Sequence, residues 1–93
     1  MKDATLGGYL KEHGRPPAFE GSDGHSYTVE VICERSESGW SAYLFFVRWQ
    51  GSEPVGHVES DYLCEAATEE EAGLKIKRLT LHEVRRLLDG MVA

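Results

Sequence analysis

The chain of 93 residues has few of the features that mark secreted, membrane or redox proteins. It contains only two cysteines, Cys33 and Cys64, which are too few to staple a small secreted domain and too far apart for a C-x-x-C motif. Reduced thiols and a cytoplasmic location are therefore expected. The longest stretch without a charged residue, residues 38–47, has about half the length of a membrane-spanning helix, so no membrane association is expected.

Positive charge is also scarce. Sixteen acidic residues against ten basic ones give a formal net charge of −6, and no long basic run offers a surface for a phosphate backbone. The ten glycines form neither a G-x-x-x-x-G-K loop nor a G-x-G-x-x-G loop that opens a helix. Nucleic acid is thus not an expected partner, and no cofactor is expected.

A chain of this size, with 41% apolar residues, folds around one core, so residues 1–93 are expected to form a single domain. Helical spacing between Thr5 and Gly14 predicts a short N-terminal helix, and a short strand follows within residues 1–24. Apolar and polar residues alternate over residues 25–35, the next strand spans residues 40–50, and a weaker edge strand spans residues 55–63. Residues 25–63 are thus expected to form an antiparallel meander.

The period changes to that of helices over residues 68–92. Capping boxes begin at Thr68 and at Thr80, and the apolar face rotates at residues 79–80, which favours two helices over one continuous helix with a wide apolar stripe. The predicted fold is α+β: an antiparallel meander of three or four strands, with the C-terminal helices packed on one face and a short N-terminal helix.

The two faces of the central strand differ in what can cover them. The turn at residues 36–39 places Val31 opposite Leu44 and Val29 opposite Phe46, on the side that meets the helices. The opposite, outer face then carries an aromatic row, Tyr43, Phe45, Val47 and Trp49. If Val58 and Tyr62 point toward the helices, the polar edge of this row consists of His57, Glu59 and Asp61. An apolar centre with a charged edge is typical of an interface, and these seven residues are the predicted binding residues.

Two other interpretations of these residues stay open. The N-terminal helix or the Ala18–Phe19 strand could cover the outer face, which would make the aromatic row part of the core. His57, Glu59 and Asp61 could form a metal or catalytic site, but side chains at i and i+2 on a strand lie about 7 Å apart, which favours a solvated edge strand instead. No catalytic residue and no metal ligand is therefore predicted.

Two partial resemblances complete the comparison of motifs. The order helix, three strands, helix resembles the double-stranded RNA-binding domain, although Glu69, Glu70 and Glu71 stand where that family has a lysine-rich helix start. Residues 27–78 resemble HicB-type antitoxin domains in the strand 27–31, the Gly-Trp-Ser-Ala-Tyr hairpin and the Thr-x-Glu-Glu helix start, but lack that family's proline-glycine loop.

The sequence thus favours a small non-enzymatic binding or regulatory module that associates with itself or with another protein through the outer face. A symmetric dimer is the simplest such arrangement. The alternatives are a HicB-like antitoxin-type domain and a small enzyme or metal site at His57, Glu59 and Asp61.

Overall fold

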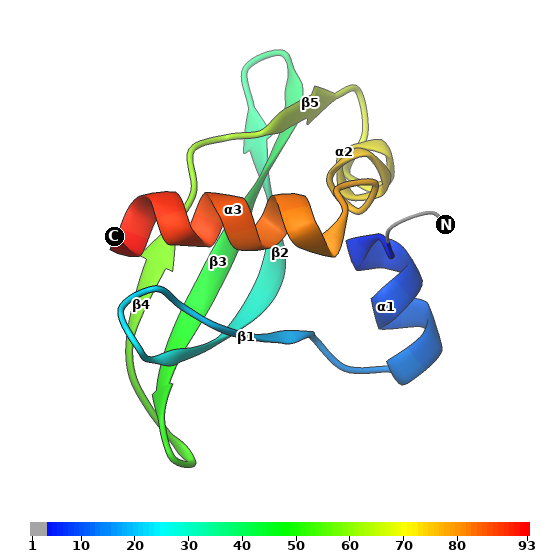
Figure 1. Ribbon diagram of the computed structural model, residues 1–93. Helices are drawn as coiled ribbons and strands as arrows, with labels where there is room; N and C mark the ends of the chain where they lie inside the picture. Colours follow the sequence, from blue (N-terminus) through cyan, green and yellow to red (C-terminus); the bar gives the residue numbers. More distant parts are fainter. Residues whose placement is uncertain (1–3) are drawn as a thin grey trace.

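A long hairpin is the framework of the sheet in the computed structural model, which describes residues 4–93 (Figure 1). Strands β2 and β3 pair in antiparallel fashion, with Val29 opposite Phe46 and Val31 opposite Leu44, the register that the turn residues predict. Along the chain the elements are α1 (Leu6–His13), β1 (Ala18–Glu20), β2 (Ser26–Ser36), β3 (Gly39–Gln50), β4 (Glu53–Glu59), β5 (Cys64–Ala66), α2 (Glu69–Ile76) and α3 (Leu81–Val92). The predicted α+β fold is confirmed.

Two different strands share the second edge of β3. The sheet order is β1-β2-β3-β4, and β5 pairs with the N-terminal part of β3 while β4 pairs with its C-terminal part. The sequence predicted one weak edge strand over residues 55–63. That prediction was wrong in its bounds, because β4 ends at Glu59 and a separate strand, β5, begins at Cys64.

All three helices contribute to a single core on one face of the sheet, which we call the inner face. Figure 1 shows α3 crossing the strands, with α1 and α2 near its N-terminal end. The buried core residues are Leu6, Tyr27, Val29, Ala42, Leu44, Phe46, Ala72, Ile76, Val84 and Leu88. Burial of the leucine, valine, isoleucine and phenylalanine side chains among them supplies about 1.5–3 kcal/mol each, so this face is the main source of stability.

Side-chain caps fix where the helices begin. Thr5 accepts a hydrogen bond from the Gly8 amide at 3.0 Å, and Thr68 accepts one from the Glu71 amide at 3.1 Å. The Thr80 amide donates to the Glu83 carboxylate and the Glu83 amide donates to the Thr80 hydroxyl, both at 3.0 Å. These two residues therefore form a complete capping box. The helices α2 and α3 are therefore separate, as the change of phase near residue 80 predicts.

The N-terminal segment packs where α2 and α3 join. The Leu6 amide donates to the Leu79 carbonyl at 2.8 Å, and the Gly7 amide donates to the Lys77 carbonyl at 2.9 Å. A Cβ atom at Gly7 would lie 3.0 Å from Cβ of Lys77, so glycine allows this close approach without a shift of Lys77. Helix α1 thus belongs to the inner side of the molecule. No helix within residues 4–93 is long and apolar enough to span a bilayer.

Removal of the Thr80 cap is expected to destabilise the protein. The Thr80→Ala variant leaves the Glu83 amide without its side-chain acceptor, which should lower the free energy of unfolding by about 0.5–2 kcal/mol. Chemical denaturation measures this change, and Thr80→Ser, which keeps the hydroxyl, serves as the matched control. Equal stabilities of Thr80→Ala and Thr80→Ser would show that the cap does not hold α3 in place.

Candidate functional site

Apolar side chains occupy the outer face of the sheet along its central strand. We call the following set the outer stripe: Ile32, Tyr43, Phe45, Val47 and Trp49. Each of these residues is partly buried, and none belongs to the core cluster to which the three helices contribute. The other predicted covers lie elsewhere, because β1 extends the sheet beside β2 and α1 docks near Leu79. Within residues 4–93, no helix or strand is packed over the stripe.

Neighbouring polar residues fix the aromatic rings of the stripe against the sheet. The ring of His57 stacks on that of Phe45, with a centroid distance of 4.8 Å and an interplanar angle of 14°. The indole nitrogen of Trp49 donates to the Thr28 hydroxyl at 2.9 Å. Because these contacts hold the rings in place, their exposed surfaces are pre-ordered for contact with another molecule.

The three residues weighed as a metal site do not converge. His57 Nε2 lies 3.7 Å from Glu59 Oε1, whereas Asp61 follows the end of β4 and, together with Glu59, lines a hollow that His57 does not line. In the described range 4–93 there is no group of three or more His, Cys, Asp and Glu side chains that could hold a metal ion. The imidazole of His57 instead packs on Phe45.

An irregular segment after β4 changes which side chains reach the outer face. Phe45 pairs with Glu59, and Ala42 pairs with Cys64. Between these two pairs β3 advances by three residues and the facing chain by five, so the facing chain contains two extra residues. Ser60 contributes to this irregularity, because its hydroxyl accepts the Leu44 amide at 2.9 Å in place of a backbone carbonyl.

The expectation that Tyr62 points toward the helices was therefore wrong. Leu63 packs against the core, whereas Tyr62 is 59% exposed and its ring meets that of Tyr43. Val58 does lie on the core side, as expected. The two extra residues interrupt the alternation within residues 60–63, and it resumes with Cys64 on the core side, which explains why strict alternation failed for Tyr62 and Leu63.

The irregular segment creates a concave site that we call the tyrosine hollow. Its volume is about 300 Å³, and it is lined by Glu34, Tyr43, Glu59, Ser60, Asp61 and Tyr62. The two tyrosine rings lie 5.7 Å apart at an angle of 76°, and the Tyr62 hydroxyl donates to Glu34 at 3.3 Å. The negative charge of Glu34 raises the pKa of Tyr62, so the phenol stays protonated at neutral pH.

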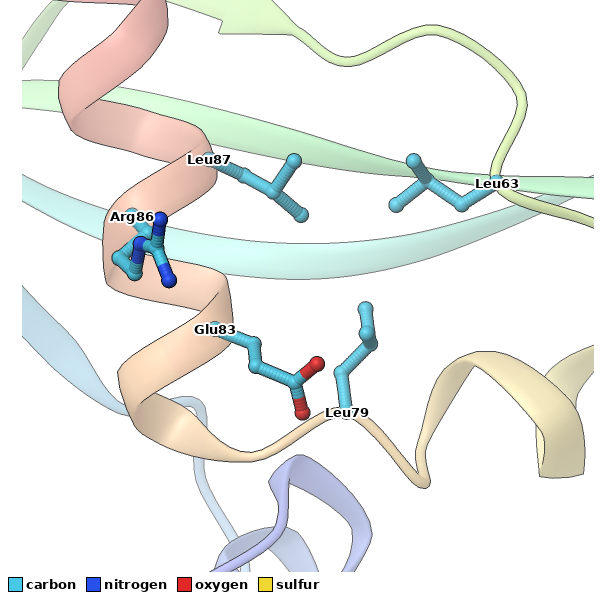
Figure 2. Close-up of a pocket in the computed structure, with 5 residues that line it drawn as sticks. All are labelled: Leu63, Leu79, Glu83, Arg86 and Leu87. Atoms are coloured by element: carbon cyan, nitrogen blue, oxygen red, sulfur yellow. The ribbon is translucent and has the colours of Figure 1, made fainter.

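A second hollow lies between α3 and the segment that precedes β5 (Figure 2). It has a volume of about 450 Å³, and Figure 2 shows Leu63 and Leu87 pointing toward one another, with Leu79 nearby. Glu83 also lines it, but its carboxylate accepts the Thr80 amide, and this hydrogen bond lowers the pKa of Glu83. Glu83 is thus engaged in capping α3 rather than set up for acid–base chemistry.

The two thiols have environments that disfavour the reactive thiolate. Burial raises the pKa of Cys33, with a smaller contribution from the negative charge of Glu69, and burial also raises the pKa of Cys64. Nucleophilic cysteines need the opposite shift of pKa, so neither environment favours a nucleophilic thiol.

A polar network at the end of the inner face was missed at the level of sequence. The Tyr27 hydroxyl donates to Asp23, and the guanidinium of Arg48 donates to the same hydroxyl at 2.7 Å. Arg48 also lies 3.8 Å from Asp23, whose other oxygen accepts the His25 amide at 3.1 Å. The sequence did offer one signal for this network. Arg48 falls on the inner side of β3, and a cation placed there needs a carboxylate partner.

Comparison of the chain with protein-family models, with curated proteins and with solved structures finds no match. The partial resemblances to HicB-type antitoxin domains and to double-stranded RNA-binding domains therefore rest on their local motifs alone.

Acid is expected to weaken the protein through Asp23. The hydrogen bond from Tyr27 lowers the pKa of Asp23, so the native state favours the ionised carboxylate more than the unfolded chain does. The resulting stabilisation is present at neutral pH and is lost as the pH falls below about 4. In urea titrations, Asp23→Asn should show a shallower loss of stability with acid than the wild type.

The control for this comparison is Asp61→Asn, which removes an aspartate outside the network. Its acid profile should follow that of the wild type. Parallel profiles for the wild type and Asp23→Asn would contradict the assignment of the network as a source of acid sensitivity.

Proposed function

We propose that the protein is a non-enzymatic binding module that self-associates through the outer face of its sheet. The observation that carries this proposal is the outer stripe, a row of ordered apolar side chains over which none of the described elements packs. Aromatic residues bury about 150–250 Å² each, so covering the stripe provides a substantial driving force. The two free thiols are consistent with action in a reducing compartment such as the cytoplasm.

The strand register makes the stripe complementary to a second copy of itself. A two-fold axis that crosses the strands between Phe45 and Val47 would lay the two stripes antiparallel. Phe45 of one copy then lies opposite Val47 of the other, and Tyr43 lies opposite Trp49. Large rings thus meet smaller side chains near the axis, as packing of two sheets requires.

The polar neighbours of the stripe are compatible with the same axis. Glu59 pairs with Phe45 and His57 pairs with Val47 along the sheet, so Glu59 of one copy lies opposite His57 of the other. By the same reasoning, Glu30 lies opposite Thr28. An acidic residue therefore faces a histidine or a hydroxyl rather than another carboxylate, which supports a second copy as the occupant.

A charge at the centre of the stripe is expected to separate the subunits. In Phe45→Glu, association would bury a carboxylate in an apolar interface, so the association constant should fall at least about a hundredfold. Sedimentation at micromolar concentrations should give a dimer for the wild type and a folded monomer for this variant. Leu74→Glu is the control, because Leu74 is 55% exposed and lies on α2, away from the stripe.

Three outcomes would contradict self-association through this face. The first is a wild type that stays monomeric at high concentration. The second is loss of the dimer in Leu74→Glu as well as in Phe45→Glu. The third is unfolding of Phe45→Glu, which would make Phe45 part of the intramolecular core.

The proposed orientation of the two copies is tested by changing the charge at His57. His57→Arg places a permanent positive charge opposite Glu59 and should strengthen association, whereas His57→Glu should weaken it, each by up to about fivefold. The same two substitutions at His82, which is exposed at the start of α3, should leave the association constant unchanged. Equal effects of Arg and Glu at His57 would contradict the antiparallel arrangement.

A further inference from the structure

We propose that the tyrosine hollow is a binding site for an alkylammonium group, and this inference does not depend on self-association. The hollow combines three features that together fit an organic cation: a concave space, two aromatic walls and a negative charge.

The walls of the hollow are aromatic and nearly perpendicular. The rings of Tyr43 and Tyr62 both line it, and their planes meet at 76° with centroids 5.7 Å apart. A cation placed within about 6 Å of a ring centroid is attracted by the negative face of the ring, and two walls at this angle allow contact with both. Methyl or methylene groups around the nitrogen would also pack on these walls.

The positions of both rings follow from the backbone. Tyr43 stands on the central strand, and Tyr62 reaches the outer face only because of the irregular segment at residues 60–63. Ser60 anchors that segment to β3 through the hydrogen bond from the Leu44 amide. The Tyr62 ring is held by its contact with Tyr43 and by the hydrogen bond to Glu34, although 59% of the residue is exposed.

The hollow is negatively charged, and no lysine or arginine from the described residues lines it. Glu34, Glu59 and Asp61 contribute carboxylates, and of the ion pairs within residues 4–93 only the one between His57 and Glu59 involves this set. Burial and then the charge of Glu34 raise the pKa of Tyr43, and the charge of Glu34 is the main cause of the raised pKa of Tyr62. A ligand of positive charge would neutralise this group.

The shape favours an organic cation over a metal ion. The described residues hold no cluster of ligands that could coordinate a metal, and the volume of about 300 Å³ far exceeds what one ion fills. The same chemistry is available from a free quaternary amine such as choline and from a methylated lysine side chain of another polypeptide. Both present a cation whose surface is apolar, which suits aromatic walls.

The test is a titration of the full-length protein followed by NMR signals of the two tyrosine rings. The probes are choline, its neutral isostere 3,3-dimethylbutan-1-ol, and N-acetyl-trimethyllysine amide. We expect choline and the trimethyllysine probe to shift the ring signals saturably, and the neutral alcohol to shift them little. Tighter binding of the trimethyllysine probe assigns the site to a protein side chain, and equal affinity assigns it to free amines.

Substitutions separate the contributions of ring and charge. Tyr62→Ala and Glu34→Gln should each weaken binding of choline about two- to fivefold, as expected for one exposed cation–π or charge contact. Tyr62→Phe keeps the ring and should bind nearly as the wild type does. Glu37→Gln, in the exposed turn between β2 and β3, is the control for Glu34→Gln and should not change the affinity.

Two results would overturn the proposal. One is the absence of a saturable shift with choline in a wild type whose spectrum shows a folded protein. The other is an equal response to choline and to the neutral alcohol, which would show that the charge plays no part. Neither result bears on self-association, which the sedimentation of Phe45→Glu tests separately.

Discussion

The antiparallel pairing of β2 with β3 is the constraint on which the rest of the structure depends. Once Val29 is opposite Phe46, every side chain of the two strands is assigned to one face or the other. Because β3 is apolar on both sides, this assignment produces two apolar faces. The helices cover the inner face, and the outer face carries Phe45 and its apolar neighbours. The candidate site is thus a direct consequence of the register.

Because the N-terminal segment docks on the inner side, none of the elements within residues 4–93 covers the outer face. Leu6 is fully buried among inner-face residues, and the amides of Leu6 and Gly7 are bound to carbonyls at the junction of α2 and α3. The same junction requires the break before Thr80, since a continuous helix would keep the Leu79 and Lys77 carbonyls within its own hydrogen bonds. Docking of α1 and separation of α2 from α3 are therefore coupled.

The parts of the fold that could be predicted from sequence are those with a regular period or a cap. The turn at residues 36–39 predicted the register of β2 and β3, and the Thr80 capping box predicted the start of α3. The segment at residues 60–63 could not be predicted in this way, because a serine side chain replaces a backbone acceptor there and the alternation is interrupted. Strict alternation therefore places Tyr62 on the wrong face of the sheet. The side chains of the outer stripe could be predicted from the sequence, but the tyrosine hollow could not.

Tyr43 joins the two proposed activities of the outer face. It is one end of the outer stripe and also one wall of the tyrosine hollow. In an antiparallel dimer its ring would lie opposite Trp49 of the second copy, which would bring a third aromatic ring close to the hollow. A cation bound in the hollow would then gain a further aromatic neighbour, so dimer formation would strengthen cation binding without being required for it. Thermodynamic linkage relates the two effects. The factor by which the dimer binds the cation more tightly than the monomer must equal the factor by which each bound cation raises the association constant of the dimer.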